Sequence, residues 1–279
     1  MKKLTILLFS LLISFNSYGL FHKTVCVETD SQVQIRNDIV YLTNKTKTFT
    51  GKNLCEYGNG QNKSEGKVED GKKEDIWTSW YQNGQIKVEE NYKDGKLNGR
   101  WSHFFENGQQ DIEKNYKDDI LEGMFTRWYK NGQIMKEGNY IDGKADGKWI
   151  WWYENGQIQQ EGTVKNGKLD GKFTQWNKNG NIVSEANYKD DKEEKATRYW
   201  YFSTFADTPG DGMKKRKEEN SFKGMTDGKQ IWWYENGQIK KEGNYKDGKK
   251  DGKWTSWHEN GQIELEATYK DGECISGDC

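Results

Sequence analysis

The dipeptide Asn-Gly recurs along this chain at a fixed spacing. It begins at residues 59, 83, 107, 131, 155 and 179, successive steps of 24 residues, and returns at 236 and 260, again 24 apart. A fixed period in this range indicates a tandem array of one supersecondary unit, in which each copy leans on its neighbours because it cannot bury its apolar side alone. This period constrains the fold more than any other feature of the sequence.

One interval breaks the period. The Asn-Gly pairs at 179 and 236 are 57 residues apart, which fits a degenerate copy, an ordinary step and about nine inserted residues. The degenerate copy holds Tyr199-Trp200-Tyr201 and an insertion from Ser203 to Gly210 with the only proline. We therefore count nine copies, and we divide the chain into a cap and first hairpin (20–58), regular repeats (59–202), the insertion (203–210), final repeats (211–273) and a cysteine-containing tail (274–279).

The composition agrees with an extended array. Charged residues make up 31% of the chain and aromatic residues 14%, whereas hydrophobic residues reach only 32%. Aromatic residues without an aliphatic core predict a thin β-structure whose side chains stack in rows. The 44 acidic and 43 basic residues nearly cancel, which argues against a nucleic-acid partner, since such a partner needs a basic stripe.

Residues 1–19 differ from the rest of the chain. Lys2 and Lys3 precede an apolar run from Leu4 to Phe15, followed by Ser17-Tyr18-Gly19. This order is typical of a secretory signal peptide, so we predict export to the periplasm or the extracellular space. The apolar run is too short to span a membrane and no later stretch could do so, so no transmembrane segment is expected in the mature chain.

The four cysteines lie at the ends of the predicted mature chain: Cys26, Cys55, Cys274 and Cys279. In an exported chain this placement favours disulfides. Three pairings are possible, and proximity favours Cys26 with Cys55 and Cys274 with Cys279, each fastening a terminal repeat. No Cys-x-x-Cys pair or adjacent histidine supports a zinc site, so no metal is expected.

The repeat predicts a β-hairpin. Within residues 147–170, Asn155-Gly156 lies between an aromatic run and a segment with β-branched residues, and this dipeptide favours a type I′ turn with positive φ at both residues. Such a turn pairs Glu154 with Gln157, and the pairs that follow are Tyr153 with Ile158, Trp152 with Gln159, Trp151 with Gln160, Ile150 with Glu161, and Trp149 with Gly162. The other turn of each period, represented by Asp142 to Gly147, is expected to be a longer loop that leads into the next hairpin.

The same register explains the glycines in the strands. Glycine weakens a strand unless an aromatic neighbour covers it, so Trp149 is expected to lie flat across Gly162. Equivalent pairs are Gly123 with Tyr140, Gly138 with Phe125, and Gly243 with Gln230, the last lacking its aromatic ring. These pairs are interpreted as structural devices.

A second aromatic row is the candidate binding site. One register position is aromatic in eight copies and is expected on the face opposite Trp149: Trp80, Phe104, Trp128, Trp152, Trp176, Trp200, Trp233 and Trp257. With two strands per copy, these rings recur at roughly 10 Å. The row is either a packing ladder or a stacking platform for an extended ligand such as a sugar or peptide, and the seven tryptophans are the binding candidates.

No catalytic constellation is evident. The histidines are His22, His103 and His258, and no Ser-His-Asp order, His-Glu-x-x-His pattern or nucleotide loop appears. Glu137, Glu161 and Glu242 repeat at one strand position, but a glycosidase needs one asymmetric carboxylate pair with separated pKa values. We expect no enzymatic activity, no catalytic residues and no cofactor.

The motifs resemble a known family. Tyr245 to Trp254, followed by Glu259 to Ile263, resembles the MORN repeat variant, and the whole chain is similar to proteins labelled YwqK-family antitoxins. The segment from Ile39 to Gly51 also resembles the start of that family, and the resemblance extends over residues 36–273. It implies an all-β, elongated antiparallel meander of tandem hairpins used for binding or scaffolding.

Three functional interpretations follow from the repeat and the signal segment. The first is a non-catalytic protein-binding scaffold at the cell envelope. The second is a carbohydrate- or cell-wall-binding module. The third is an antitoxin or immunity-like partner of a secreted toxin, because residues 1–19 are not expected in a cytoplasmic antitoxin.

Overall fold

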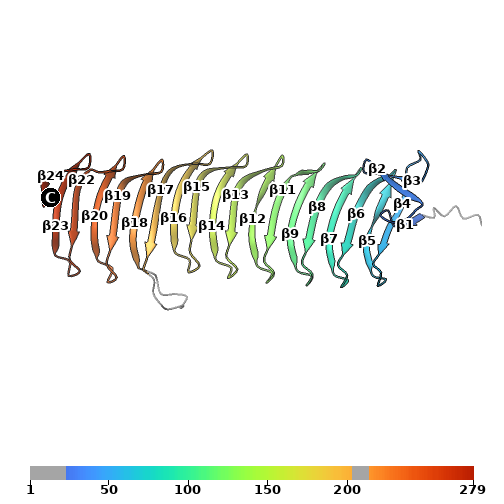
Figure 1. Ribbon diagram of the computed structural model, residues 1–279, viewed down its shortest axis with the longest axis horizontal. Coiled ribbons are helices and arrows are strands. Elements are labelled where there is room, and N and C mark those ends of the chain that lie inside the picture. The colour runs from blue at the N-terminus through green and yellow to red at the C-terminus, as the bar shows by residue number, and fades with distance from the viewer. Residues whose placement is uncertain (1–22, 203–213) are drawn as a thin grey trace, which may run out of the picture.

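The computed structural model describes residues 23–202 and 214–279. The predicted signal peptide and the insertion from Ser203 to Gly210 lie outside the described residues. The described chain consists of strands and turns, and consecutive strands lie side by side from the N-terminal end to the C-terminal end (Figure 1). This confirms the predicted all-β meander of tandem hairpins.

Twenty-two strands form one sheet, and β2 and β3 form a separate hairpin. The neighbours are antiparallel except β1, which runs parallel to β4. The first half contains β1 (Lys23–Val25), β2 (Val33–Arg36), β3 (Ile39–Leu42), β4 (Gly51–Glu56), β5 (Asn62–Glu69), β6 (Lys72–Trp80), β7 (Ile86–Lys93), β8 (Lys96–Phe104), β9 (Gln110–Lys117), β10 (Ile120–Leu121), β11 (Gly123–Trp128) and β12 (Ile134–Ile141).

The second half contains β13 (Lys144–Trp152), β14 (Ile158–Lys165), β15 (Lys168–Trp176), β16 (Ile182–Lys189), β17 (Lys192–Tyr201), β18 (Lys215–Phe222), β19 (Met225–Trp233), β20 (Ile239–Lys246), β21 (Lys249–Lys250), β22 (Gly252–Trp257), β23 (Ile263–Lys270) and β24 (Glu273–Gly277). Nine copies with two strands each predict about 18 strands. The described residues hold 24, because two strands are interrupted and both ends add short strands.

The Asn-Gly turn is not of type I′. Gly156 has a φ of 84°, but φ is not positive at Asn155, so only one of the two turn residues is left-handed. Tyr153 N–H donates to Gln157 O at 2.8 Å, and the Asn155 side chain accepts from Gln157 N–H at 3.1 Å. The turn is therefore a longer loop with glycine in the left-handed position, followed by a bulge.

The bulge changes the predicted register next to the turn. Trp152 pairs with Ile158, and the residue after Ile158 is left out of the ladder. The predicted pairs of Trp152 with Gln159 and of Tyr153 with Ile158 are therefore wrong. Further from the turn the prediction is confirmed, with Ile150 opposite Glu161, Trp151 opposite Gln160 and Trp149 opposite Gly162.

The tight two-residue turn lies at the other edge of the sheet. Asp142 and Gly143 have φ of 48° and 74°, and Ile141 pairs directly with Lys144. Positive φ at both turn residues is the type I′ signature. The expected loop from Asp142 to Gly147 is therefore wrong, because β13 has already begun at Lys144.

Side chains of the turns join neighbouring copies. At the Asn-Gly edge, the Tyr153 hydroxyl donates to Trp176 O at 2.8 Å and the Asn155 amide donates to Lys178 O at 3.2 Å. At the opposite edge, Asp142 N–H donates to the Glu122 carboxylate at 2.9 Å. Each copy is thus attached to the next at both edges of the sheet. At the tight-turn edge, the Glu122 carboxylate binds the backbone of the turn.

Aromatic rings cover Gly66, Gly138, Gly162 and Gly243, but from a different strand than expected, and Gly123, expected to pair with a covering Tyr140 ring, meets only the Asn115 side chain. A Cβ atom on Gly138 would lie 2.1 Å from the Trp149 ring, and one on Gly162 would lie 2.5 Å from the Phe173 ring. The prediction that Trp149 covers Gly162 is therefore wrong, although the two residues are paired. Each ring leans on the preceding hairpin, and Gly243, expected to lack a ring, is covered by Trp254.

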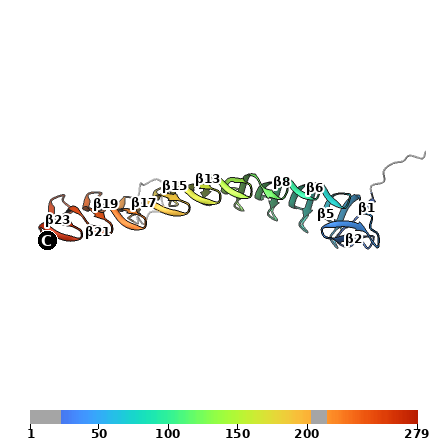
Figure 2. The same ribbon diagram turned by 90° about the horizontal axis from the view of Figure 1, so that it is seen from above.

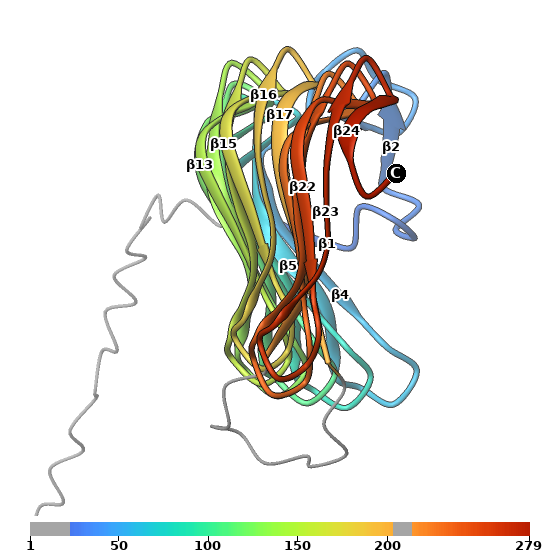
Figure 3. The ribbon, with the colours of Figure 1, turned by 90° about the vertical axis from the view of Figure 1, so that its left-hand side faces the viewer.

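The buried apolar residues lie on the face that carries Trp149, which we call the Trp149 face. One cluster contains Phe125, Trp149 and Val164. The strands curve, and the β2–β3 hairpin lies on the inner side of the curve (Figure 3), where Val33 and Val40 pack in one cluster with Trp77. Away from this hairpin the array is a thin ribbon (Figure 2).

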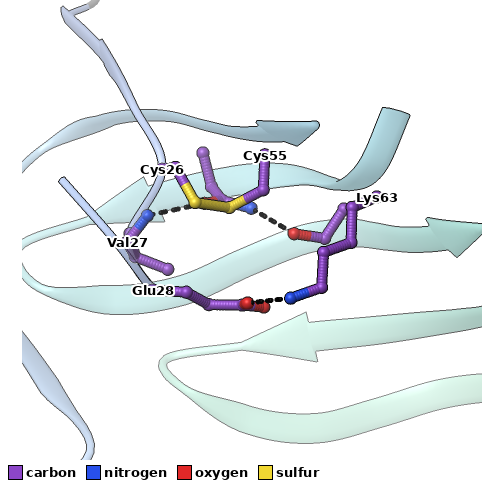
Figure 4. The surroundings of a disulfide bond; sticks show 7 residues. Cys26, Val27, Glu28, Cys55 and Lys63 are labelled. Carbon is purple, nitrogen blue, oxygen red and sulfur yellow. Dashed lines mark hydrogen bonds and ion pairs between the residues drawn. A yellow bond between two sulfur atoms is a disulfide. The ribbon is translucent and has the colours of Figure 1, made fainter. Parts of the chain in front are cut away.

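Disulfides close both ends of the array. Cys26 is bonded to Cys55, and Cys274 to Cys279, as predicted. The first bond joins Cys26, directly after β1, to Cys55 in β4, the strand that runs parallel to β1 (Figure 4). Beside it, Glu28 and Lys63 form an ion pair. No group of three or more metal-ligating side chains lies within the described residues, and no helix in residues 23–202 or 214–279 is long and apolar enough to cross a membrane.

We predict that Gly138→Ala lowers the free energy of unfolding by about 1 to 3 kcal/mol, because the new methyl group occupies the space of the Trp149 ring. The control is Gly58→Ala, since a Cβ atom there meets nothing within 4 Å. Urea unfolding of both variants measures the difference. Equal midpoints would show that the ring yields without cost.

The two disulfides should stabilise the fold unequally. Cys26 and Cys55 are separated by 29 residues and Cys274 and Cys279 by 5. In the chain-entropy model, replacing the first pair with alanine costs about 3.5 kcal/mol and replacing the second about 2 kcal/mol. Urea unfolding of the two double variants tests this order. Mass analysis of protein exported to an oxidising compartment checks the bonds, and four free thiols would contradict them.

Candidate binding surfaces

The predicted aromatic row lies on the other side of the sheet, which we call the Trp152 face. Its rings are half-buried at the ends of strands that lead into the Asn-Gly turns. Trp152 faces Ile158, and the same Trp–Ile pair recurs at Trp80, Trp128, Trp176, Trp233 and Trp257, whereas Phe104 faces Gln110. The structure thus repeats one aromatic–aliphatic unit, and its binding role remains a prediction.

Trp200 does not belong to this row. Ala196 pairs with Ala186, which pairs with Phe173 on the Trp149 face. Alternation along β17 then places Trp200 on the Trp149 face as well. The Lys217 ammonium confirms this placement, because it lies 4.8 Å from the Trp200 ring and 5.5 Å from the Trp232 ring.

Tyr199 takes the Trp152 face in the degenerate copy. Its hydroxyl donates to Glu185 at 3.4 Å, and burial, followed by Glu218 and Glu185, raises its pKa to about 12. The register shifts because the step from Phe173 to Ala196 contains one residue fewer than the regular period. Small side chains fill the Trp149 face here, since Ala186, Ala196 and Ser221 are all buried.

A row of glutamates crosses the centre of the Trp152 face. Each glutamate faces a threonine, serine or isoleucine on a neighbouring strand. The glutamates of the row are Glu65, Glu89, Glu113, Glu137, Glu161, Glu185, Glu242 and Glu266. Most members have a basic partner, as Glu161 has Lys148 at 2.9 Å and Glu185 has Lys172 at 2.6 Å. The carboxylates therefore sit in similar solvated ion pairs, which contribute little each.

Two copies replace the basic residue of this row with an apolar one. Met124 stands in the place of Lys148 and is 56% exposed, and Glu137 beside it is in no ion pair of the described residues. Ile76 stands in the same place and is 58% exposed. A shallow cleft of about 560 Å³ between β4 and β6 is lined by Ile76, Thr78 and Trp80. The Trp152 face thus exposes an apolar side chain in each of these two copies.

One polar cluster has no counterpart in the other copies. On the Trp149 face, His103 Nδ1 lies 2.9 Å from Asp111 Oδ2, and Arg127 Nε lies 3.5 Å from Asp111 Oδ1. Asp111 is only 7% exposed. It occupies the position of Lys87 and Gln159. The repeat pattern therefore does not predict this cluster. The sequence signal that could have found it is the aspartate at position 111, which departs from the pattern.

Tyr81 completes this cluster. Its hydroxyl donates to Phe104 O at 2.8 Å and lies 3.4 Å from His103 Nε2. Burial raises the pKa of Tyr81, and the charges of Glu106 and Asp111 raise it further, so the hydroxyl stays protonated at neutral pH. The cluster surrounds the buried Asp111 carboxylate with an arginine and hydrogen-bonding groups, but Asp111 Oδ1 and Arg127 Nε make no hydrogen bond within the described residues.

Aromatic rings pack along the Trp149 face. Trp149 is 3% exposed, and its ring centroid lies 5.3 Å from Tyr140, 5.8 Å from Phe125 and 6.0 Å from Trp151. The Lys136 ammonium covers the group at 5.6 Å from the Trp149 ring, and burial, followed by the charge of Arg127, lowers its pKa. This face is the core of a sheet that has no second layer.

Comparison with known proteins identifies the repeat. The sequence profile of the MORN repeat variant matches the chain seven times, over residues 76–94, 97–118, 121–142, 145–166, 169–190, 226–247 and 250–271. A match such as 145–166 contains the two strands of one hairpin and ends in the tight turn. None of the curated proteins compared with the chain is similar to it in sequence.

Two solved structures illustrate the remaining similarity. The crystal structure of TcdB2-TccC3-Cdc42 is 12% identical, with 82% of this chain and 13% of that chain covered and a TM-score of 0.20. The Tc holotoxin pore of Photorhabdus luminescens is 10% identical, with 85% and 14% covered and a TM-score of 0.19. This chain spans a small part of either, and such scores establish no relationship of fold or role.

We predict that Asp111→Ala costs about 3 kcal/mol of stability, because it removes the buried carboxylate that contacts both His103 Nδ1 and the Arg127 guanidinium. The matched control is Glu161→Ala, which removes a more exposed ion pair and should cost at most about 1 kcal/mol. Thermal and urea unfolding measure both. A loss for Asp111→Ala no larger than the control would mean that the cluster does not stabilise the array.

Proposed function

Because the chain belongs to the MORN repeat variant family, we propose that it is an exported, non-catalytic module that binds other proteins at the cell envelope. The observation that carries the proposal is the single-layer sheet, which presents half-buried aromatic rings on the Trp152 face along nearly its whole length. An elongated repeat with rings at a regular spacing suits an extended polypeptide partner.

The two terminal disulfides support export. They close both ends of the array, and disulfides persist mainly in oxidising compartments. The signal-like residues 1–19 point to the same route. Both features support the proposed location in the periplasm or outside the cell.

The repetition of the polar groups supports a binding role without catalysis. The glutamates of the Trp152 face share one kind of neighbourhood, in which most carboxylates pair with an exposed lysine. An enzyme needs one asymmetric site in which neighbouring groups differ in proton affinity. The asymmetric cluster around Asp111 pairs its buried carboxylate with His103 and Arg127.

The other interpretations of the sequence remain predictions. A carbohydrate-binding module would use the same aromatic rows, and an antitoxin or immunity-like partner would use the same faces for one secreted toxin. The protein-binding role is favoured because exposed aliphatic residues, including Ile76, Met124 and Ile263, accompany the rings of the Trp152 face.

The test compares Trp152→Ala with Trp149→Ala. We expect Trp152→Ala to keep the fold and to weaken binding of a captured partner by about 1 to 3 kcal/mol, because contact-surface aromatics carry such energies. We expect Trp149→Ala to lose about 3 to 5 kcal/mol of stability, because its ring is buried. Thermal melts and pull-downs from envelope extract, followed by titration of the partner, provide the measurements.

The same variants distinguish the ligand classes. Peptidoglycan fragments and soluble glycans are titrated beside the captured protein. Binding of a glycan alone would replace the protein-binding proposal with the carbohydrate interpretation. A strongly lowered melting temperature for Trp152→Ala, with every ligand bound as before, would show that the row is packing and contradict the proposed binding surface.

A further inference from the structure

One position of the repeat distinguishes three copies from the rest. Two residues before each tight turn, the chain has tyrosine at 92, 116, 140, 188, 245 and 269, but Val68, Val164 and Ser221 at the remaining places. The tyrosine rings pack on the Trp149 face, as Tyr140 does against Trp149. Loss of the ring leaves a space that the fold must fill in another way.

In two of the three copies the space is filled. Over Ser221 the guanidinium of Arg198 donates to the serine hydroxyl at 3.1 Å. Over Val68 the β2–β3 hairpin packs, and Val33, Val40 and Val68 belong to one buried cluster. The array thus accepts either a long side chain of its own or a segment of chain laid on the sheet.

The third copy is open. A cleft of about 370 Å³ lies over Val164 and is lined by Tyr140, Ala145, Trp149, Leu169 and Phe173. Ala145 enlarges it, because Phe49, Leu97, Leu121 and Leu169 occupy the same repeat position in other copies. The small side chains of Val164 and Ala145 therefore leave one apolar hollow on the Trp149 face.

The N-terminal hairpin shows how such a hollow is occupied. Val40 N–H donates to Gly71 O at 2.8 Å, and a Cβ atom on Gly71 would lie 2.6 Å from the Ile39 side chain. Gly167 is the equivalent of Gly71 and has nearly the same φ, 84° against 81°. Nothing lies within 4 Å of a Cβ atom on Gly167, so the backbone at this equivalent turn is uncovered.

We propose that the cleft over Val164 is a docking site for an extended segment of a partner polypeptide that carries β-branched aliphatic side chains. The segment would lie as β3 lies over Val68, with an aliphatic side chain in the hollow and a backbone N–H donated to the carbonyl of Gly167. This inference rests on the proposed protein-binding function and assigns it a second surface, on the face opposite the Trp152 row.

The occupant is a partner chain and not a second copy. In every molecule of this protein, the β2–β3 hairpin already packs on Val68 of the same chain and is held beside the Cys26–Cys55 disulfide. Its valines are 6% and 7% exposed, so they are not free to enter another molecule. A partner segment of similar chemistry meets no such competition at Val164.

The test uses the mature chain and a synthetic peptide with the sequence of residues 31–49, which contains the docking strands. Fluorescence anisotropy of the labelled peptide reports binding. We expect saturable binding that Val164→Tyr weakens at least tenfold, because this variant restores the ring found in the neighbouring copies. Lys148→Ala, whose exposed side chain pairs with Glu161 on the opposite face, should leave the affinity unchanged. A second filling variant, Ala145→Leu, should act as Val164→Tyr does if the latter proves unstable.

The outcomes separate this inference from the proposed function. No saturable peptide binding, or binding that both filling variants leave unchanged, overturns the docking site, and the proposed function still stands if the envelope partner is captured. Peptide binding that depends on Val164, with no envelope partner captured, supports the docking site and defeats the proposed function. A dimer of the mature chain that Val164→Tyr dissociates would place a second copy in the cleft and overturn our choice of occupant.

Discussion

The fold depends on the contact between a ring and a glycine of the preceding hairpin. A sheet without a second layer has nothing to cover its apolar face, and the rings of Trp77, Trp149, Phe173 and Trp254 solve this by lying on backbone that lacks a side chain. The indole N–H groups of Trp77 and Trp254 also donate to backbone carbonyls of that strand. The same side chain thus buries itself and joins two repeats.

The repeat period was enough to predict the class of fold, the hairpins and the central register, because alternation along a strand admits few choices once an anchor is known. The turns were predicted the wrong way round. Asn-Gly suits a type I′ turn, but it also suits a longer loop in which Asn155 accepts from the backbone and Gly156 alone is left-handed. Propensity alone does not separate these two outcomes, whereas the position of Tyr153 in the completed sheet does.

The candidate sites were predicted where copies are alike and missed where they differ. Counting 24 residues from Trp176 leads to Trp200, but a shorter step in β17 places that ring on the opposite face. Asp111 and Val164 were each visible as departures from the repeat, yet the meaning of a departure depends on what surrounds it. Only the packed sheet shows that one is paired with His103 and that the other borders a cleft.

The degenerate copy interrupts the regular aromatic packing of the array. Between β16 and β18 on the Trp149 face, Ala196 and Ser221 stand where most other copies have aromatic rings, so smaller apolar side chains are buried in this region. In a linear array the free energy of unfolding is a sum over neighbouring interfaces, and its weakest interface sets where cooperativity fails. The degenerate copy is therefore where we expect the N-terminal segment, which holds the Val164 cleft, to separate from its C-terminal neighbour when the array unfolds.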